Sequence, residues 1–596
     1  MLPEAGAGRG GRRGGWGTDA GWSVLLALVV LGPLLLGRGY WLFGDMVFVP
    51  RQPWKDAWLG LDGSLPRAVP MDALVSVATL VVPGWLVQKA LLLGALVLGG
   101  VGAGRFVAGA PAYARLAAIT LFVWNPWTHA HLAMGQWAIL AGYLLLPWVA
   151  TAATRVRTDP RAGWPGLVVV LVASAVCSPS SGLVAVATAL VLGAARRPRW
   201  QPAALLATGV VANLPWLLPT LVASTSRVGV DGVFAAFAAR AESSLGVLAS
   251  LWSLGGTWKT SVVPAERGSV VVVALAGLLT CVALLGLRSR PRPAGTRRLG
   301  LLAACALLVA ALPTLPGGDG LLEALGERVP ALAVLRDSHR YLAPAALLLL
   351  PGVAGAATWA GSRVREGREA MWAVVALLAV APVLLLPSLA WGGLGTFERT
   401  TYPADWDRVA AVLEADLDTR ATTRATTRTV VLPWAGSYRG FAWNDGRAVL
   451  DPAPRLLPGD VVVDDRLVVD GLVVPSEDPA VRDVAAALEG GDPGRTAAAL
   501  RRLGVRFVLV EKGMPSGTVP TGDVVVDGPA LRLVDLGAPG ADPRDGAGGT
   551  ARAVVLAGGG LTASLLLVSL ALILRRGSEG RHIDDRRCES LGGDPA

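Results

Sequence analysis

The chain has 596 residues, of which 53% are hydrophobic and only 16% are charged. About a quarter of the residues in soluble domains are charged, so this composition favours a membrane protein. The formal net charge of +10 does not indicate nucleic-acid binding, because the arginines lie in short runs between apolar segments and form no basic stripe interleaved with aromatic side chains.

Apolar segments that are long enough, or nearly long enough, to cross a bilayer recur along the chain. The first, residues 22–37, follows a basic stretch and precedes no small-residue cleavage site, so we interpret it as an uncleaved span. Residues 164–195 contain two short segments joined by Ser-Pro-Ser-Ser, and these are either two spans or one re-entrant hairpin. The predicted spans are 22–37, 84–104, 116–127, 132–153, 164–177, 182–195, 200–222, 269–287, 299–313, 339–360, 371–391 and 552–574.

The charges between the apolar segments predict the orientation. If all twelve segments cross, both termini are cytoplasmic, and the short segments on that side carry many more arginines for their length than the short outer loops do. This bias is the one described by the positive-inside rule. The sequence therefore predicts a mainly α-helical, multi-pass protein of a bacterial plasma membrane. Residues 22–391 would form its transmembrane helical domain, and residues 1–21 and 575–596 its cytoplasmic tails.

The first outer loop, residues 38–83, carries an aspartate close to the end of the first span. Asp45 follows the apolar run by a few residues, and Asp56 lies farther along the loop. A carboxylate near hydrocarbon is costly, so it either hydrates the end of a span or does chemistry. Spacing alone leaves both roles open for Asp45. Residues 70–85 are typical of a helix that lies along the membrane surface.

A second polar group lies on the same outer side, in the segment 125–137. It contains His129, His131 and Gln136. Two histidines separated by one residue suggest metal binding, but two ligands in a short loop do not make a site. A helical-hairpin turn with its polar groups at the lipid headgroups explains the segment equally well.

A third polar group opens the predicted span 339–360. Arg336, His339 and Arg340 surround the start of this helix, where unpaired N–H groups favour anions. Two arginines at such a position suit a phosphate or pyrophosphate headgroup. Ordinary interfacial anchoring is the alternative, but arginine on the outer side runs against the charge bias. The pattern therefore favours anion binding.

Residues 392–551 differ from the rest of the chain and are long enough to bury a core of their own. Segments rich in β-branched residues alternate here with segments of helical periodicity, which is typical of an α/β fold. The sequence therefore predicts an extracytoplasmic α/β domain between the helical domain and a last span, 552–574. The predicted strands are 429–434, 505–512 and 530–537, and the predicted helices are 403–417 and 494–504.

This organisation resembles the GT-C class of membrane glycosyltransferases, and within it the YfhO-like and actinobacterial arabinofuranosyltransferase branch. The shared features are an acid in the first outer loop, an interfacial helix, many spans and an outer α/β domain. The segments that carry the resemblance are Phe-Gly-Asp at 43–45, then 125–148, 335–344 and 499–512.

The resemblance implies an inverting transfer of a sugar from a polyprenyl-phosphate donor to an envelope glycan or lipid acceptor, on the outer face of the membrane. Asp45 would act as general base on the acceptor hydroxyl. Fixed cations would stabilise the leaving phosphate, and a divalent cation is a possible cofactor. The loop lacks the paired acids that many members have, which leaves metal dependence open. The phosphate-binding candidates are Arg336, His339 and Arg340, and the residues expected to line the cleft are Asp56, His129, His131 and Gln136.

Non-enzymatic functions are the alternatives. The protein could be a transporter, a flippase or an assembly factor for lipid-linked envelope intermediates, a sensor whose outer domain binds glycan, or a relative that has lost catalysis. A transporter should carry ionisable residues in the middle of its spans. The predicted span centres are nearly free of charge, whereas polar groups gather at the outer face. This distribution favours a site at the outer interface.

Overall fold

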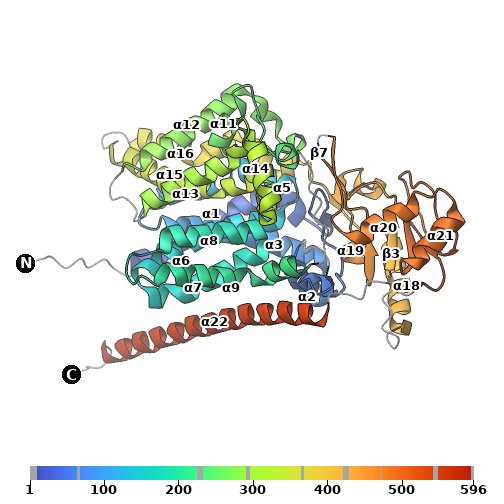
Figure 1. Cartoon of the computed structure of the whole chain (residues 1–596). Coiled ribbons are helices and arrows are strands. Elements are labelled where there is room, and N and C mark those ends of the chain that lie inside the picture. The colour runs from blue at the N-terminus through green and yellow to red at the C-terminus, as the bar shows by residue number, and fades with distance from the viewer. Residues whose placement is uncertain are drawn as a thin grey trace, which may run out of the picture.

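The computed structural model describes residues 10–63, 68–223, 232–289, 295–363, 368–420, 428–469, 471–540 and 548–591. The chain forms a large helical part and a smaller sheet-containing domain near the C-terminus (Figure 1). That domain lies at one end of the helices, and the last helix, α22 (Gly549–Leu591), runs from it toward the opposite end. The predicted combination of a mainly helical fold and a sheet-containing domain is confirmed.

Eight helices among the described residues are long and apolar enough to cross a membrane, and each coincides with a predicted span. Four further predicted spans correspond to shorter helices: α4 (Ala112–Val123), α8 (Pro179–Gly193), α12 (Val270–Gly286) and α16 (Arg368–Leu385). The predicted number of about twelve spans therefore stays a prediction. The eight candidates are Trp16–Leu35, Gly84–Phe106, Trp137–Thr158, Pro160–Cys177, Gln201–Val222, Thr296–Thr314, Ser338–Arg363 and Gly549–Arg576.

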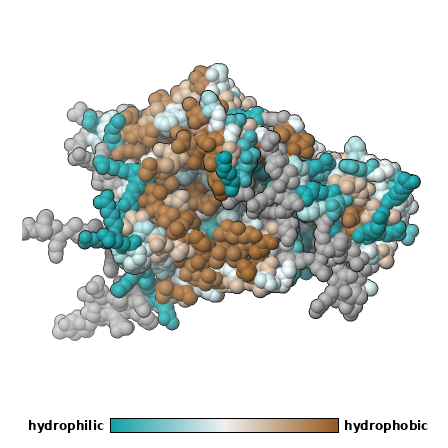
Figure 2. Space-filling view, viewed as in Figure 1, coloured by the Kyte–Doolittle hydropathy of each residue, from teal (hydrophilic) through white to brown (hydrophobic). Residues whose placement is uncertain are grey.

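The surface of the helical part is apolar, as a lipid-facing surface should be (Figure 2). Hydrophobic residues cover the helices, whereas hydrophilic residues gather on the sheet-containing domain and at the opposite edge. Helix α22 is the clearest case, because its leucines point outward although the helix packs on α7 and α9. Exposed leucines of this kind are stable in lipid and would be unfavourable in water.

Residues 164–195 form two separate helices, α7 (Pro160–Cys177) and α8, joined at a single residue, Ser178. The Ser178 hydroxyl accepts a hydrogen bond from the backbone N–H of Ser181 and so caps α8. Both helices pack on α6 (Trp137–Thr158). Whether both cross the bilayer or turn back within it stays open.

The first outer loop is folded tightly against its surroundings. Strand β1 (Tyr40–Trp41) pairs with β2 (Arg399–Thr400), which directly precedes the sheet-containing domain. Farther along, α2 (Met71–Val81) turns Leu74, Val77 and Leu80 outward. An outward apolar stripe at this spacing is the pattern expected of an interfacial helix.

The main sheet of the sheet-containing domain has five strands in the order β10-β11-β9-β3-β6, and β4-β5 and β7-β8 form separate two-stranded sheets. Strands β6, β3 and β9 are parallel, and β11 and β10 continue the sheet in antiparallel fashion. Alternate residues of β3 and β9 face opposite sides, as the two-residue period of a strand requires. Val430 and Val508 pack against α20 and α21, whereas Val431 and Leu509 belong to the core shared with α18.

The strands are β3 (Arg428–Leu432), β4 (Tyr438–Gly440), β5 (Ala448–Leu450), β6 (Asp460–Val462), β7 (Leu467–Val469), β8 (Leu472–Val474), β9 (Val505–Glu511), β10 (Asp523–Asp527) and β11 (Leu531–Asp535). The helices of this domain are α18 (Asp405–Arg420), α19 (Ala453–Leu456), α20 (Pro479–Leu488) and α21 (Pro493–Arg502). The remaining helices are α1 (Gly10–Leu35), α3 (Gly84–Phe106), α5 (Pro126–Ala133), α9 (Gln201–Val222), α10 (Val233–Ala236), α11 (Gly246–Trp252), α13 (Thr296–Ala311), α14 (Gly318–Arg328), α15 (Ala343–Arg363) and α17 (Trp391–Leu394).

Candidate active site

Asp45 lies where the first outer loop meets both the helical part and the sheet-containing domain. One oxygen of its half-buried carboxylate accepts a hydrogen bond from the Tyr438 hydroxyl, and the other accepts one from the Gln136 amide at 3.3 Å. The backbone N–H of Asp45 donates to the carbonyl of Met134 at 2.9 Å. Two segments that are distant in sequence, residues 134–136 and Tyr438, therefore fix the position of Asp45.

Two glycines allow the backbone around Asp45 to approach so closely. Gly44 and Gly135 have φ angles of +53° and +75°, in the left-handed region that favours glycine. A Cβ atom on Gly44 would lie 2.1 Å from the carbonyl oxygen of Met134, and one on Gly135 would lie 2.4 Å from that of Phe43. Any side chain at either position would push Asp45 away from residues 134–136, the α5–α6 corner.

The sheet-containing domain holds the other side of the loop. The N–H of Gly44 donates to the carbonyl of Ala448, and the N–H of Leu450 donates to the carbonyl of Gly44, both at 2.8 Å. Ala448 and Leu450 belong to β5, which pairs with β4, the strand that carries Tyr438. The contact between Tyr438 and Asp45 is thus part of a continuous backbone-paired interface.

Sequence reasoning missed two residues of this neighbourhood, Tyr438 and Lys259. The ammonium of Lys259 lies 5.5 Å from the centre of the Tyr438 ring. Thr257, two residues before Lys259, donates to the sulfur of Met134 at 3.8 Å. No local sequence pattern indicates Tyr438 or Lys259, because only tertiary packing brings Tyr438 to Asp45 and Lys259 to Tyr438.

Asp56 has different neighbours from Asp45, although both belong to the first outer loop. Its carboxylate accepts a hydrogen bond at 2.6 Å from Arg552, near the start of α22. A second nitrogen of Arg552 donates to the carbonyl of Leu61 at 3.3 Å. These contacts tie the last helix to the first loop, so the structure gives Asp56 a structural contact and does not bring it to Asp45.

His131 and His339 belong to a buried stack of rings. The ring of Trp127 lies 3.6 Å from His131 and 4.4 Å from Tyr143, and His131 lies 5.4 Å from His339, measured between ring centres. Burial holds the pKa of His131 well below its ordinary value, and the neighbouring imidazole of His339 adds to this. The structure therefore unites two predicted histidines from different segments in one apolar environment.

His129 points elsewhere, although it lies on the same short helix, α5. Burial lowers its pKa to about 4, and the nearby carboxylate of Glu266 offsets only part of this effect. Glu266 in turn accepts hydrogen bonds from the N–H and the hydroxyl of Ser388, at 3.0 and 2.7 Å. His129 is therefore a buried residue near Glu266, and its expected place in the cleft stays a prediction.

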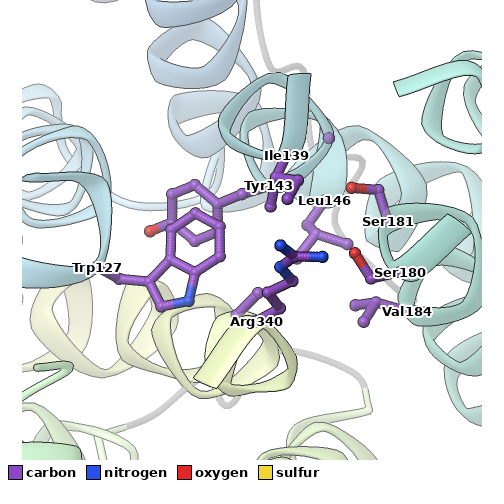
Figure 3. Close-up of a pocket in the computed structure, with 10 residues that line it drawn as sticks. Trp127, Ile139, Tyr143, Leu146, Ser180, Ser181, Val184 and Arg340 are labelled. Carbon is purple, nitrogen blue, oxygen red and sulfur yellow. The ribbon is translucent and has the colours of Figure 1, made fainter. Parts of the chain in front are cut away.

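A pocket adjoins the ring stack, and Arg340 extends into it (Figure 3). The guanidinium of Arg340 lies between the rings of Trp127 and Tyr143 on one side and the hydroxyls of Ser180 and Ser181 on the other. The cavity is small, about 10 Å³, which is room for about one water molecule. A cation, two hydroxyls and aromatic walls are groups that suit an anionic group attached to an apolar one, but such a ligand would fit only if the helices around the pocket moved apart.

The two other members of the third polar group do not line this pocket. The guanidinium of Arg336 lies 4.6 Å above the ring of Phe237, and His339 is enclosed by the ring stack. Arg340 itself forms an ion pair with Asp337 at 2.8 Å, which offsets part of its charge. Arg340 is therefore the one of the three that the structure directs into free space.

The pocket and Asp45 are both close to the α5–α6 corner. Asp45 contacts Met134 and Gln136 of the α5–α6 corner, and the pocket is lined by Trp127 just before the corner and by Ile139 just after it. Asp45 itself does not line the pocket. The predicted acid and one predicted arginine are thus brought to one corner but not into one cavity.

The predicted divalent cation has no evident binding group in the part of the chain that the structure describes. No three or more His, Cys, Asp and Glu side chains among these residues are arranged to hold a metal ion. The partners of Asp45 are a hydroxyl and an amide, not a second carboxylate. These residues do not fit a carboxylate-bound metal, so no chemical step is assigned to one here.

A solved structure with the same fold exists. No protein-family model and no curated protein matches this sequence. The chain is similar to the arabinofuranosyltransferase AftD from Mycobacteria, in a structure solved by electron cryo-microscopy, with a TM-score of 0.53 and 17% sequence identity. The match covers 91% of this chain but only 42% of AftD, so the chain spans less than half of that protein.

The fold is therefore similar to that of AftD. The similarity to AftD agrees with the arabinofuranosyltransferase part of the expected resemblance and gives no support to the YfhO-like part. At this identity the comparison concerns the fold alone. What the chain does must be argued from its own residues.

Proposed function

We propose that the protein is a membrane glycosyltransferase of envelope synthesis, which transfers a sugar from a polyprenyl-phosphate donor to a glycan or lipid acceptor. The observation that carries this proposal is the position of Asp45: a carboxylate that accepts hydrogen bonds from Tyr438 and Gln136, beside a corner that also borders a cationic pocket, in a fold similar to that of AftD. The similarity to AftD makes an arabinofuranosyl donor the first one to test.

In the proposed reaction the acceptor hydroxyl oxygen attacks the anomeric carbon of the donor sugar while Asp45 takes the hydroxyl proton. The bond between that carbon and the phosphate oxygen breaks, and the phosphate leaves with the bonding electron pair. Attack from the side opposite the phosphate inverts the anomeric configuration. A base must lie within hydrogen-bond reach of the hydroxyl, and the half-exposed carboxylate of Asp45 satisfies this requirement.

Arg340 is the proposed partner of the leaving phosphate. Negative charge builds up on that group as the bond breaks, and a fixed cation in a partly dry site stabilises it more than water does. The hydroxyls of Ser180 and Ser181 are the second set of donors on this side. Arg336 and His339 would not bind the phosphate directly. Arg336 would pack against Phe237 and His339 within the ring stack, and both would support the site from there.

The proposed topology places the reaction on the outer face of a bacterial plasma membrane. The sheet-containing domain and the first outer loop would be extracytoplasmic, with both termini in the cytoplasm. The arginine bias supports this orientation. The far end of α22 lies opposite the sheet-containing domain, as the proposal requires (Figure 1).

The test is transfer by the purified protein in lipid nanodiscs, with a radiolabelled polyprenyl-phosphate arabinofuranose as donor and envelope glycan fragments as acceptors. We expect labelled product from the natural protein and none from Asp45→Asn. Asp62→Asn is the matched control, because it makes the same change at an exposed position of the same loop. Full transfer by Asp45→Asn would remove the catalytic assignment. Movement of the donor across the bilayer without transfer would favour a flippase.

A further inference from the structure

The Tyr438 hydroxyl is the closest polar partner of the proposed base, and it comes from the sheet-containing domain. It donates to one oxygen of Asp45 across 393 residues of sequence. Tyr438 follows β3 by a short segment, so it belongs to the edge of the sheet where the parallel strands end. Ligand and catalytic groups of open α/β sheets commonly lie at this edge.

The strand that carries Tyr438 is anchored from behind by a buried ionic cluster. Arg439, the next residue, pairs with Glu511 at 2.7 Å and with Asp451 at 3.1 Å. All three side chains are almost completely buried, and Glu511 is the last residue of β9. Neighbouring residues of a strand point to opposite faces, so fixing Arg439 on one face directs Tyr438 to the other.

We propose that Tyr438 is a positioning residue that fixes the ionised carboxylate of Asp45 in its reactive orientation, so that the sheet-containing domain completes the candidate active site. This inference rests on the proposed role of Asp45 as the base. A phenol hydroxyl donates to an ionised carboxylate more strongly than to a protonated one, so the contact favours the form that can accept a proton.

The other polar groups around Asp45 do not duplicate this effect. Gln136 donates to the second oxygen at the longer distance of 3.3 Å, and its amide is neutral. Lys259 faces the Tyr438 ring. Arg439, Asp451 and Glu511 contact one another behind the strand.

The test uses Tyr438→Phe, which keeps the ring and removes only the hydroxyl. The readout is the carboxylate stretching band of Asp45 in the infrared spectrum of the full-length protein, identified by its absence from Asp45→Asn. In Tyr438→Phe we expect this band to shift, because the carboxylate loses its closest hydrogen-bond donor. We also expect kcat to be lower by about tenfold and the donor KM to be unchanged, since a hydrogen bond to a charged group contributes roughly 1.5 kcal/mol or more.

Tyr402→Phe is the matched control. The Tyr402 hydroxyl also joins the two parts of the protein, but it donates to the carbonyl of Phe48 at 3.0 Å and not to Asp45. Its loss should leave the Asp45 carboxylate band where it is. A ring-fluorinated tyrosine at position 438 keeps the hydroxyl and makes it a stronger donor, so it should shift the band in the direction opposite to that seen in Tyr438→Phe. That variant also tests the proposal if Tyr438→Phe fails to fold.

Failure of this inference can be told apart from failure of the proposed function. If the band has the same frequency in Tyr438→Phe, Tyr402→Phe and the natural protein, Tyr438 does not position Asp45. If the band shifts as expected but no variant and no natural protein transfers sugar, the contact is real and the proposed reaction is wrong. Equal shifts in both phenylalanine variants would also overturn the inference, because the effect would then come from loosening the interface.

Discussion

The surroundings of Asp45 and the pocket of Arg340 differ in how the chain builds them. Asp45 is held by Gln136, Tyr438 and the backbone of Met134, which come from two structural parts of the molecule. The Arg340 pocket is built by neighbouring helices of the helical part alone. The proposed base therefore depends on docking of the sheet-containing domain, whereas the proposed phosphate site does not.

This difference predicts that the two halves of the reaction can be separated by mutation. A change at Asp45 or at the interface should affect turnover and leave donor binding intact. A change in the pocket should affect donor binding first. The α5–α6 corner, which touches both, is the one place where a single change should damage both.

The largest effect is expected for Asp45→Asn. Asparagine keeps the shape of the side chain but cannot take a proton, and the loss of a general base commonly lowers kcat by about 10²–10⁴-fold. Binding of a polyprenyl-phosphate analogue, measured by calorimetry in nanodiscs, should stay within about twofold of the natural protein. An equal loss of analogue binding would mean that Asp45 belongs to the donor site and that the two regions are not separable.

A large effect on stability is expected for Arg439→Met. The change leaves Asp451 and Glu511 buried without their cation, and breaking such a cluster typically costs about 3–5 kcal/mol. Hydrogen exchange of β9 should rise strongly, while exchange in the helices around the Arg340 pocket should not change. Arg532→Met is the control, because its partner Asp527 is exposed and water already screens that pair. Similar exchange in both variants would show that the cluster does not hold the strand of Tyr438.

A smaller effect is expected for Arg340→Gln. Glutamine can still donate a hydrogen bond but carries no charge, so affinity for the polyprenyl-phosphate analogue should fall by about tenfold. Once the donor is saturating, kcat should fall less than in Asp45→Asn. Arg328→Gln makes the same change at an exposed arginine of α14 and should bind normally. Unchanged affinity in Arg340→Gln would exclude the pocket as the phosphate site.

The sequence indicates the components of the fold better than their assembly. Span composition and strand patterns predict the helical part and β3, β9 and β11, because burial leaves a local record in the residue types. The pairing of Asp56 with Arg552 joins residues 496 apart, and no local pattern records it. Tyr438 could not be predicted for the same reason. Its sequence context is that of an ordinary tyrosine in a short strand, and its contact with Asp45 exists only after the strand has packed against the first outer loop.

Ser180 and Ser181 show a related limit. In the sequence they are part of a short polar segment between two apolar segments, and this pattern predicts only a turn. The structure turns this link toward Arg340, which lies on a helix 160 residues away, and a pocket results (Figure 3). Arg336, His339 and Arg340 look equivalent in the sequence. The structure separates them, because only Arg340 lines the pocket, whereas Arg336 lies above the ring of Phe237 and His339 belongs to the ring stack.

The smallest effect is expected for Glu511→Gln, which tests the cluster behind Tyr438 from the opposite direction. Burial raises the pKa of Glu511 well above its ordinary value, and the charge of Asp451 raises it further. A carboxyl group with a raised pKa in the folded state binds more protons there than in the unfolded state. The sheet-containing domain therefore becomes less stable as pH rises above the ordinary glutamate pKa.

Glutamine resembles the protonated form of Glu511 and should remove this pH dependence while keeping a partner for Arg439. The natural protein and the variant should therefore have similar stability in acid. The sheet-containing domain of the variant should be the more stable of the two as pH rises, as measured by thermal unfolding of that domain across the pH range. A variant that is less stable than the natural protein at every pH would mean that Glu511 is ionised in the fold and that Arg439 needs both carboxylates to hold Tyr438 against Asp45.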